Sequence, residues 1–329
     1  MSKVKFYEVT NATINNAHFL ITKLDNREKN CKFVAATLFD GETEKTVNMF
    51  HPIKGTPGGL TEAGLAQMGI TEGCILETSI CKNDQFYNVS NWRLNTDSSI
   101  TKADFVHIAP VNLDETYQWI VDTVKSVDSN PDNVGPYKSL SYMTVQLLET
   151  HKDAIKKSSA AVRMHHNFIG GLVYHTYRML SLALKATETY TGLDRELLIC
   201  GTAIHDIGKI YSLETDDVGT AQTTIEGLLL DHSVIGIKMI QEEATKNLYN
   251  PEKTLMLQHM IASHHGKKEW DAIVTPSIPE AEMLHLIDMI DSRMNMFEEA
   301  YKGQEPGTVS SERVYGLENS FIYLRNTTE

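Results

Sequence analysis

The sequence predicts an α+β protein of two domains, a small N-terminal β-barrel followed by an all-α C-terminal domain. Residues 1–95 contain short runs in which apolar and polar side chains alternate, whereas from Leu113 onward apolar residues recur at helical spacing. Residues 96–113 between them are polar and weakly patterned. A chain of 329 residues is long enough for both domains. The predicted boundaries are 1–95 for the barrel, 96–113 for a linker and 114–329 for the helical domain.

The N-terminal part has six candidate strands separated by polar turns. They lie at residues 5–9, 18–22, 32–38, 45–50, 74–80 and 85–89. One helical interruption, near residues 61–68, falls after the third or fourth of them. Five or so short strands with a helix after the third are the outline of an OB-fold, a small barrel that often holds single-stranded nucleic acid. Other small barrels fit the same pattern.

The C-terminal part has seven candidate helices and no pattern that asks for a sheet of any size. They lie at residues 115–127, 139–157, 172–190, 194–204, 231–248, 251–263 and 280–300. Asp114 is the predicted N-cap of the first helix, and Pro251 fits a first helical turn.

The composition is that of an ordinary soluble protein, with 41% hydrophobic and 22% charged residues. The chain has no apolar run of 18 residues, and its first residues lack the apolar stretch of a signal peptide, so a cytoplasmic protein without membrane contacts is expected. The net charge of −13 argues against a basic surface that coats nucleic acid. Nucleic acid stays open as a substrate held locally.

Histidines and aspartates in or beside the apolar helical segments form the clearest functional pattern. They are His175, the pair His205-Asp206, His232, the doublet His264-His265, and Asp288. An isolated histidine is most often a core or surface residue, but that explanation would have to hold for all of these at once. A buried, unpaired Asp288 between Ile287 and Met289 would be costly, and a cation is an economical partner for it.

The pair His205-Asp206 makes geometric sense at the centre of a site for two metal ions. Sequence neighbours share one pocket only at a helix end, and Gly208 is placed to end the helix there. An aspartate has two oxygens and can bridge two cations, whereas a neutral imidazole offers one nitrogen to one cation. The pattern therefore predicts a metal-dependent hydrolase.

These motifs resemble the ligand set of the HD-domain superfamily of helical, metal-dependent phosphohydrolases. The stretches around His165-His166-Asn167-Phe168-Ile169-Gly170-Gly171, His205-Asp206-Ile207-Gly208-Lys209, Ser263-His264-His265-Gly266 and Leu286-Ile287-Asp288 resemble the YhaM-like family, 3′→5′ exoribonucleases with an OB-fold and an HD domain. The likeness spans most of the chain and includes the order of the domains. It implies that the C-terminal domain is an HD domain.

The resemblance also implies a ligand set. His175, His205, Asp206 and Asp288 would hold the first metal, and Asp206 would bridge to a second metal held by His232, His264 and His265. Asp291, three residues after Asp288, is the rival for the last place. Such a histidine-rich set favours manganese, iron, cobalt or zinc over magnesium.

The reaction expected from this site is in-line attack of a metal-bridging hydroxide on a terminal phosphodiester, with Asp206 orienting the hydroxide. Lys209 is the second catalytic candidate, as a point charge that reaches the phosphate. Weaker candidates for contacts with substrate are Arg163, His165, His166, Lys267 and Lys268. In the barrel, Phe33, Phe39, Phe50, Tyr87 and Trp92 could stack on bases, although such residues are more often core.

The leading hypothesis is a metal-dependent 3′→5′ exonuclease that acts on single-stranded RNA, with single-stranded DNA as a further candidate substrate. One alternative keeps the metals and changes the substrate to a free or cyclic nucleotide. Another is a non-catalytic single-strand-binding protein whose metals only stabilise the fold. The stretch after His264-His265-Gly266 lacks the Gly-Tyr-Pro of cyclic-dinucleotide phosphodiesterases, which weakens that substrate class. A homo-oligomer is left open.

Overall fold

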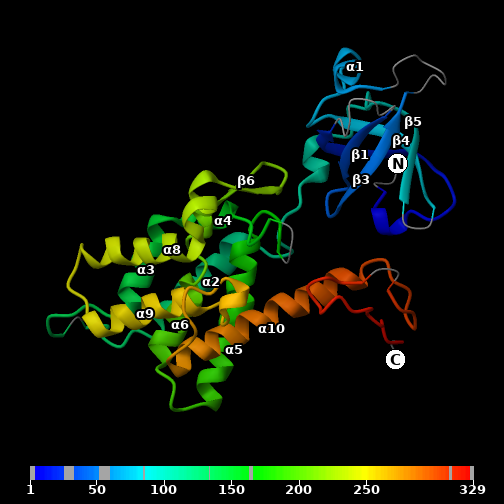
Figure 1. The fold of residues 1–329 in the computed structure, drawn as a ribbon. Helices are drawn as coiled ribbons and strands as arrows, with labels where there is room; N and C mark the ends of the chain where they lie inside the picture. Colours follow the sequence, from blue (N-terminus) through cyan, green and yellow to red (C-terminus); the bar gives the residue numbers. More distant parts are fainter. Residues whose placement is uncertain are drawn as a thin grey trace. The chain divides into compact units, whose positions relative to one another are not determined.

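The structure, a computed structural model, describes residues 4–25, 33–51, 60–83, 86–132, 134–162, 166–310 and 313–326. The chain divides into two compact units (Figure 1). The first comprises Met1–His107, Lys302–Thr308 and Arg325–Glu329, and the second comprises Ile108–Tyr301 and Val309–Leu324. The predicted combination of a small barrel and a helical domain is confirmed. The predicted boundaries assign the C-terminal tail to the helical domain alone, and they stay a prediction.

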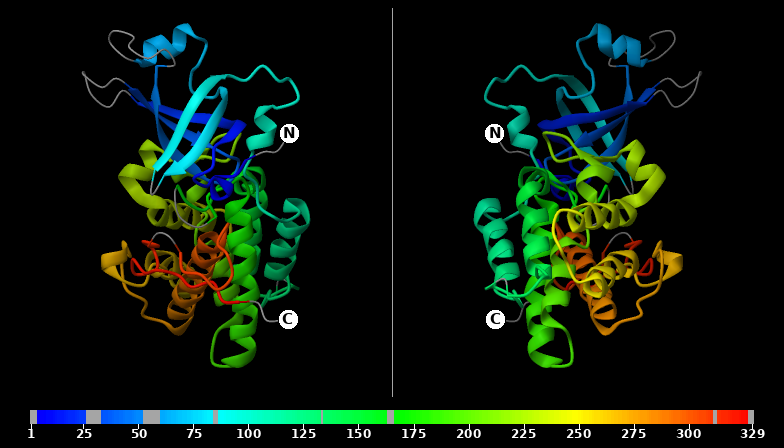
Figure 2. Two further views of the ribbon diagram at one scale, coloured as in Figure 1. Left: turned by 90° about the vertical axis from the view of Figure 1, so that its right-hand side faces the viewer. Right: turned by 90° about the vertical axis from the view of Figure 1, so that its left-hand side faces the viewer.

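Five strands close into a barrel in the first unit (Figure 2). They are β1 (Ile14–Asp25), β2 (Phe33–Phe39), β3 (Glu44–Phe50), β4 (Ile75–Asn83) and β5 (Phe86–Leu94). The strand order is β1-β2-β3-β5-β4, and β3 and β5 pair in parallel where the sheet closes. Helix α1 (Glu62–Gln67) lies between β3 and β4 in the sequence. This is the arrangement of five strands, with a helix after the third, that the alternation predicts.

The alternation sets the interior of the barrel. In β3, Val47 and Met49 are buried while Thr46, Asn48 and Phe50 are exposed, because successive side chains of a strand point to opposite faces. Apolar side chains from all five strands fill the centre. The strand β3 therefore needs only every second residue to be apolar.

The predicted strand at residues 5–9 is wrong. Residues Phe6–Glu8 form a single 3-10 turn, η1. Asp40 accepts the backbone N–H of Phe6 at 2.7 Å, and the Phe6 ring stacks on Phe19 at 4.8 Å between centroids. A hydrogen bond to a side chain and a ring contact therefore hold this segment, and it does not pair with a neighbouring strand as predicted.

Most of the proposed stacking residues belong to the barrel core. Phe39 and Trp92 are buried, Phe33 and Tyr87 are partly buried, and only Phe50 is 54% exposed. Trp92 donates its indole N–H to the carbonyl oxygen of Phe50 at 3.1 Å. Phe50 is the most exposed of the five, and a stacking role for it stays a prediction.

The second unit contains helices at all the predicted segments, with shifted ends, and a further short helix at Lys209–Ser212 that the sequence pattern does not predict. They are α2 (Leu113–Lys125), α3 (Leu140–Thr150), α4 (Lys152–Lys157), α5 (Gly171–Thr189), α6 (Arg195–Ile204), α7 (Lys209–Ser212), α8 (Ile225–Ala244), α9 (Pro251–Ser263) and α10 (Pro279–Tyr301). Among the described residues, no helix is both long and apolar enough to cross a membrane.

Local details of three predicted segments differ from the structure. Asn112, not Asp114, caps α2, since its side chain accepts the N–H groups of Asp114 and Glu115. The single helix predicted at residues 139–157 breaks at His151 into α3 and α4. A two-stranded hairpin of β6 (Leu213–Thr215) and β7 (Ala221–Thr223), which no sequence pattern indicates, precedes α8.

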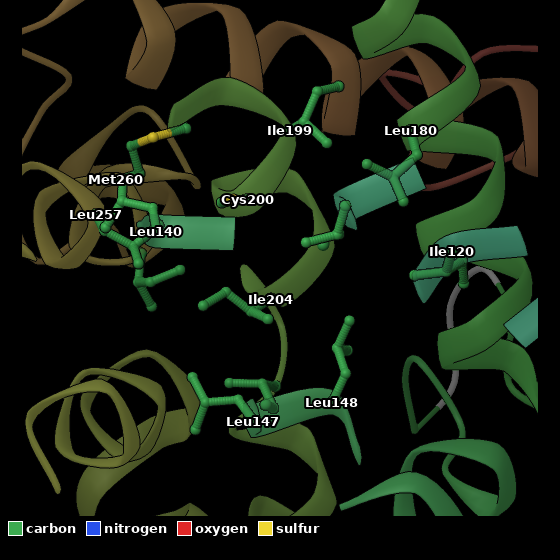
Figure 3. Packing of buried hydrophobic residues seen from close by; sticks show 14 of the residues in the cluster. Ile120, Leu140, Leu147, Leu148, Leu180, Ile199, Cys200, Ile204, Leu257 and Met260 are labelled. Atoms are coloured by element: carbon green, nitrogen blue, oxygen red, sulfur yellow. The ribbon is translucent and has the colours of Figure 1, made fainter. Parts of the chain in front are cut away.

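Helix α6 lies at the centre of the helical core. Every residue from Glu196 to Ile204 is buried, as expected of a helix that is surrounded on all sides. Figure 3 shows Ile199, Cys200 and Ile204 of this helix among core side chains from α2, α3, α5 and α9, which include Ile120, Leu147, Leu148, Leu180, Leu257 and Met260. The C-terminal end of α6 is therefore held rigidly inside the unit.

Candidate metal centre

Two neighbouring residues at the end of α6 supply the middle of the site. The helix ends at Ile204, and His205 and Asp206 follow in a turn where both are buried. The turn frees them from the helical spacing that would point neighbours to different sides. His205 donates its Nδ1–H to the carbonyl oxygen of Thr202 at 2.9 Å, which fixes the ring and leaves Nε2 as the lone-pair nitrogen.

Gly208 has a different role from the predicted one. The helix α6 has already ended before it, and Gly208 itself has a right-handed backbone conformation. A Cβ atom at this position would lie 2.0 Å from the carbonyl oxygen of His232 and 2.8 Å from the nitrogen of Gly236, both in α8. Gly208 is therefore required for close packing of the His205-Asp206 turn against α8, which brings His232 to the site.

The Asp206 carboxylate lies between two groups of histidines. Its Oδ2 is 3.2 Å from His205 Nε2 and 3.9 Å from His175 Nε2. Its Oδ1 is 3.3 Å from His232 Nε2 and 3.7 Å from His264 Nε2. Each oxygen thus faces one pair of imidazole nitrogens, which is the geometry that a bridging carboxylate needs.

Asp288 and Asp291 lie on opposite sides of the His175 ring. Asp288 Oδ1 is 3.4 Å from Nε2, the nitrogen that faces Asp206. Asp291 Oδ2 accepts the Nδ1–H of the same ring at 2.7 Å, and its other oxygen is 2.5 Å from Arg178 Nε. The geometry favours Asp288 as a ligand and Asp291 as the residue that orients the histidine.

This division of roles gives a first prediction. Asp291→Asn should lower the free energy of unfolding of the metal-free protein by about 3 kcal/mol, because it breaks a buried pair with His175 and Arg178. Asp288→Asn should change that free energy much less but should weaken metal binding more. Urea unfolding in the presence of EDTA and equilibrium dialysis with Mn²⁺ measure the two effects. If Asp291→Asn lost metal strongly and Asp288→Asn bound Mn²⁺ as the wild type does, Asp291 would be the ligand and Asp288 would not.

The second group consists of His232, His264 and His265. Each offers a ring nitrogen, and these nitrogens lie within 4.8 Å of one another. His232 comes from α8, while His264 and His265 follow the end of α9 just as His205 and Asp206 follow the end of α6. One helix end, that of α9, and one helix interior, that of α8, therefore converge on the Oδ1 side of Asp206.

The donor set fits divalent cations. His264 donates its Nδ1–H to the carbonyl oxygen of Ile261 at 2.7 Å, and His232 donates its Nδ1–H to Asp231 Oδ2 at 3.1 Å. Their Nε2 lone pairs then face each other at 3.4 Å, which needs a positive charge between them. Among the described residues, buried His205 Nε2 and Asp206 Oδ1 have no hydrogen-bond partner. Imidazole and carboxylate donors of this kind suit transition metals and zinc.

The electrostatics of the site keep its aspartates ionised. Burial would raise the pKa of Asp206, but the charges of Lys209 and His205 hold it well below its ordinary value. Burial would also lower the pKa of His175, but its hydrogen bonds with Asp288 and Asp291 raise it to about 9. By contrast, burial and the neighbouring His265 hold the pKa of His264 well below its ordinary value. The surroundings of His175 therefore favour a positive charge more strongly than the surroundings of His264 do.

Two of the predicted catalytic or substrate residues prove to be bound to the site itself. Lys209 Nζ donates to Asp206 Oδ2 at 2.7 Å, so it lies at the centre of the site. His166 is 1% exposed and bonds through Nε2 to Asp291 Oδ2 at 2.8 Å. The contact of His166 with substrate stays a prediction, and in the structure its ring is buried against Asp291. It supports the carboxylate behind His175.

The other predicted substrate residues are less informative. Lys267 lies over the ring of Trp270 at 4.3 Å from the ring centroid, and Lys268 begins the short 3-10 helix η3 (Lys268–Trp270). Both are exposed and follow the His264-His265 doublet. Arg163 and His165 lie outside the described residues. A role of Lys267 and Lys268 in substrate binding stays a prediction.

The sequence reasoning missed Asp231, which directly precedes His232. It holds the Nδ1–H of that histidine and has a non-helical backbone conformation inside α8. An acidic residue beside a candidate ligand histidine was the available signal. Arg178, which pairs with Asp291, was also missed, since an arginine one turn after His175 has no distinctive pattern.

Comparisons with known proteins agree with this geometry. The HD domain family matches residues 172–293, a stretch that includes His175, Asp206 and Asp288. The 3′-5′ exoribonuclease YhaM of Bacillus subtilis (strain 168) is 37% identical over 220 residues, which are 67% of this chain and 67% of the relative. No solved structure gives a significant match. HD domains bind divalent metals, and the chain belongs to the YhaM-like family of HD-domain proteins.

Proposed function

We propose that this protein is a metal-dependent 3′→5′ exonuclease that hydrolyses the terminal phosphodiester bonds of single-stranded RNA. The name of the Bacillus subtilis relative supports the activity, and the order of a barrel and an HD domain supports a single-stranded substrate. The observation that carries the proposal is the Asp206 carboxylate, whose two oxygens face separate pairs of imidazole nitrogens. Single-stranded DNA is a further substrate to test.

Two divalent ions are the proposed cofactors. The first would be held by His175, His205, Asp206 and Asp288, and the second by Asp206, His232, His264 and His265. The high share of imidazole supports manganese, iron, cobalt or zinc over magnesium. When bound, such ions supply Lewis acidity toward the phosphoryl oxygens and lower the pKa of water.

The side chains of this protein would prepare the site for that chemistry. The rings of His205 and His264 are fixed by backbone carbonyl oxygens at helix ends, so their Nε2 atoms need no rearrangement on binding. Lys209 is held 2.7 Å from Asp206 and is partly exposed, with 15% of its side chain accessible. It can keep one N–H on Asp206 and donate another to a phosphoryl oxygen of the substrate. Lys209 would then stabilise charge that develops on the phosphate.

The barrel is the proposed site for single-stranded RNA away from the cleaved bond. Phe50 at the end of β3 is 54% exposed, and Phe86 at the start of β5 is 73% exposed. Exposed aromatic rings on a small barrel stack on bases without regard to sequence. The two residues belong to strands that pair where the barrel closes.

A digestion assay tests the activity and separates it from the alternatives. With Mn²⁺, a 5′-labelled single-stranded RNA should shorten stepwise from its 3′ end, and EDTA should stop the reaction because the ligands then hold no cation. A matched oligonucleotide with a blocked 3′ end should stay intact. An intact RNA together with hydrolysis of free or cyclic nucleotides would support a small-substrate phosphohydrolase. RNA binding without any product, under every divalent metal tried, would support a non-catalytic binding protein.

A further inference from the structure

Asp231 has a backbone conformation that aspartate rarely adopts. Its φ of 63° and ψ of 155° interrupt α8 directly before His232. Side chains with a Cβ clash in this region, so it is almost confined to glycine. In functional sites such strain persists where the surrounding structure holds the residue in place. The protein therefore has an aspartate at a position where glycine would cause less backbone strain.

Both oxygens of the Asp231 carboxylate are used by the residues that follow. Oδ2 accepts the Nδ1–H of His232 at 3.1 Å, and Oδ1 accepts the backbone N–H of Ser233 at 2.9 Å. In a continuous helix, neighbouring side chains diverge by about 100°, so an aspartate could not reach the ring of the next residue. The interruption at Asp231 is what turns its side chain back onto His232.

The same arrangement occurs on the other side of Asp206. Asp291 accepts the Nδ1–H of His175 at 2.7 Å, and the Nε2 of that ring points toward Asp206 Oδ2. His232 likewise has Asp231 on Nδ1 and Asp206 Oδ1 at 3.3 Å from Nε2. Each group of candidate ligands thus contains one histidine held by a carboxylate and one held by a backbone carbonyl oxygen.

We propose that Asp231 is a positioning residue for His232, the counterpart of Asp291 for His175, and that its backbone strain accompanies this role. A carboxylate on Nδ1 fixes the tautomer and the ring plane, and it makes the Nε2 lone pair a stronger ligand for a metal ion. The inference rests on the proposed function, because His232 matters as a ligand only if the site holds metal. It concerns the second group of ligands alone.

The test is Asp231→Gly, which removes the carboxylate and the strain together. Equilibrium dialysis should show that the affinity for one of two bound Mn²⁺ ions falls by roughly 10- to 100-fold. Urea unfolding of the metal-free protein should show a midpoint that is unchanged or higher, because glycine adopts this conformation freely. Asp231→Asn keeps the shape of the side chain and the strain of the backbone. It should lower the affinity for Mn²⁺ by a smaller factor and should not raise the urea midpoint of the metal-free protein.

Asp271→Gly is the matched control. Asp271 also has a positive φ, of 69°, but it directly follows the short helix η3 and is not a neighbour in sequence of a candidate ligand. Its Mn²⁺ binding should equal that of the wild type. Wild-type affinity in Asp231→Gly would overturn the inference, and so would a large fall in its metal-free midpoint, which would make the carboxylate a support of the helix. A wild-type protein that binds no Mn²⁺ and leaves RNA intact would refute the proposed function itself.

Discussion

Asp206→Asn is expected to lower the turnover of single-stranded RNA by roughly 10³-fold or more, which corresponds to about 4 kcal/mol of activation free energy. Asp206 is the side chain whose two oxygens face both groups of histidines, so the substitution weakens both proposed metal sites at once. Asparagine has nearly the same shape, and the core around α6 should therefore keep its packing. Turnover and the number of bound Mn²⁺ ions measure the effect.

Asp217→Asn provides the control for this substitution. Asp217 lies between β6 and β7, its side chain is 98% exposed, and it pairs only with Lys157, at 3.1 Å, among the described residues. Its turnover should stay within a factor of about two of the wild type, as for surface changes away from a site. An Asp206→Asn protein with two bound ions and near-normal turnover would show that the bridging role is wrong.

Gly208→Ala is expected to cause a large loss of stability and to disturb the metal centre as well. The added Cβ would lie 2.0 Å from the carbonyl oxygen of His232, and backbone atoms of a packed helix cannot move aside cheaply. Overpacking of this kind costs about 3 kcal/mol or more of unfolding free energy. Because α8 must shift, His232 should also leave its place beside Asp206. Urea unfolding and Mn²⁺ binding should therefore both change.

Gly201→Ala is a matched comparison within α6. Its Cβ would meet the terminal Cε of Met260 at 2.3 Å, and a flexible methionine can adopt another rotamer. We expect a smaller loss of unfolding free energy, and Mn²⁺ binding should stay the same. Equal losses of unfolding free energy in the two variants would contradict the claim that the backbone of α8 cannot move aside for a Cβ at residue 208.

Regular repeating patterns explain why most of the fold could be predicted. The alternation of β3 and the helical spacing of α5, α6 and α9 report a single buried face or core, which is a local property of the chain. Two of the errors lie where a side chain competes with the backbone pattern. Asp40 captures the N–H of Phe6 and prevents a strand, and Asn112 takes the cap position predicted for Asp114. Such competition depends on a partner or a register that periodicity does not report.

The two-domain fold and the residue types of the candidate metal centre could be predicted from the order of residues alone, because strand and helix periodicity and the His-Asp motifs are local features of the chain. The role of each side chain in the centre became visible only in the folded protein. Asp288 and Asp291 are one turn apart in α10, yet they contact opposite nitrogens of His175. His166 bonds to the Asp291 carboxylate behind His175, and Asp231 bonds to Nδ1 of His232, so both act on the Nδ1 side of a candidate ligand. The side of a ring that a residue reaches depends on how distant helices pack, and that is set by the whole core.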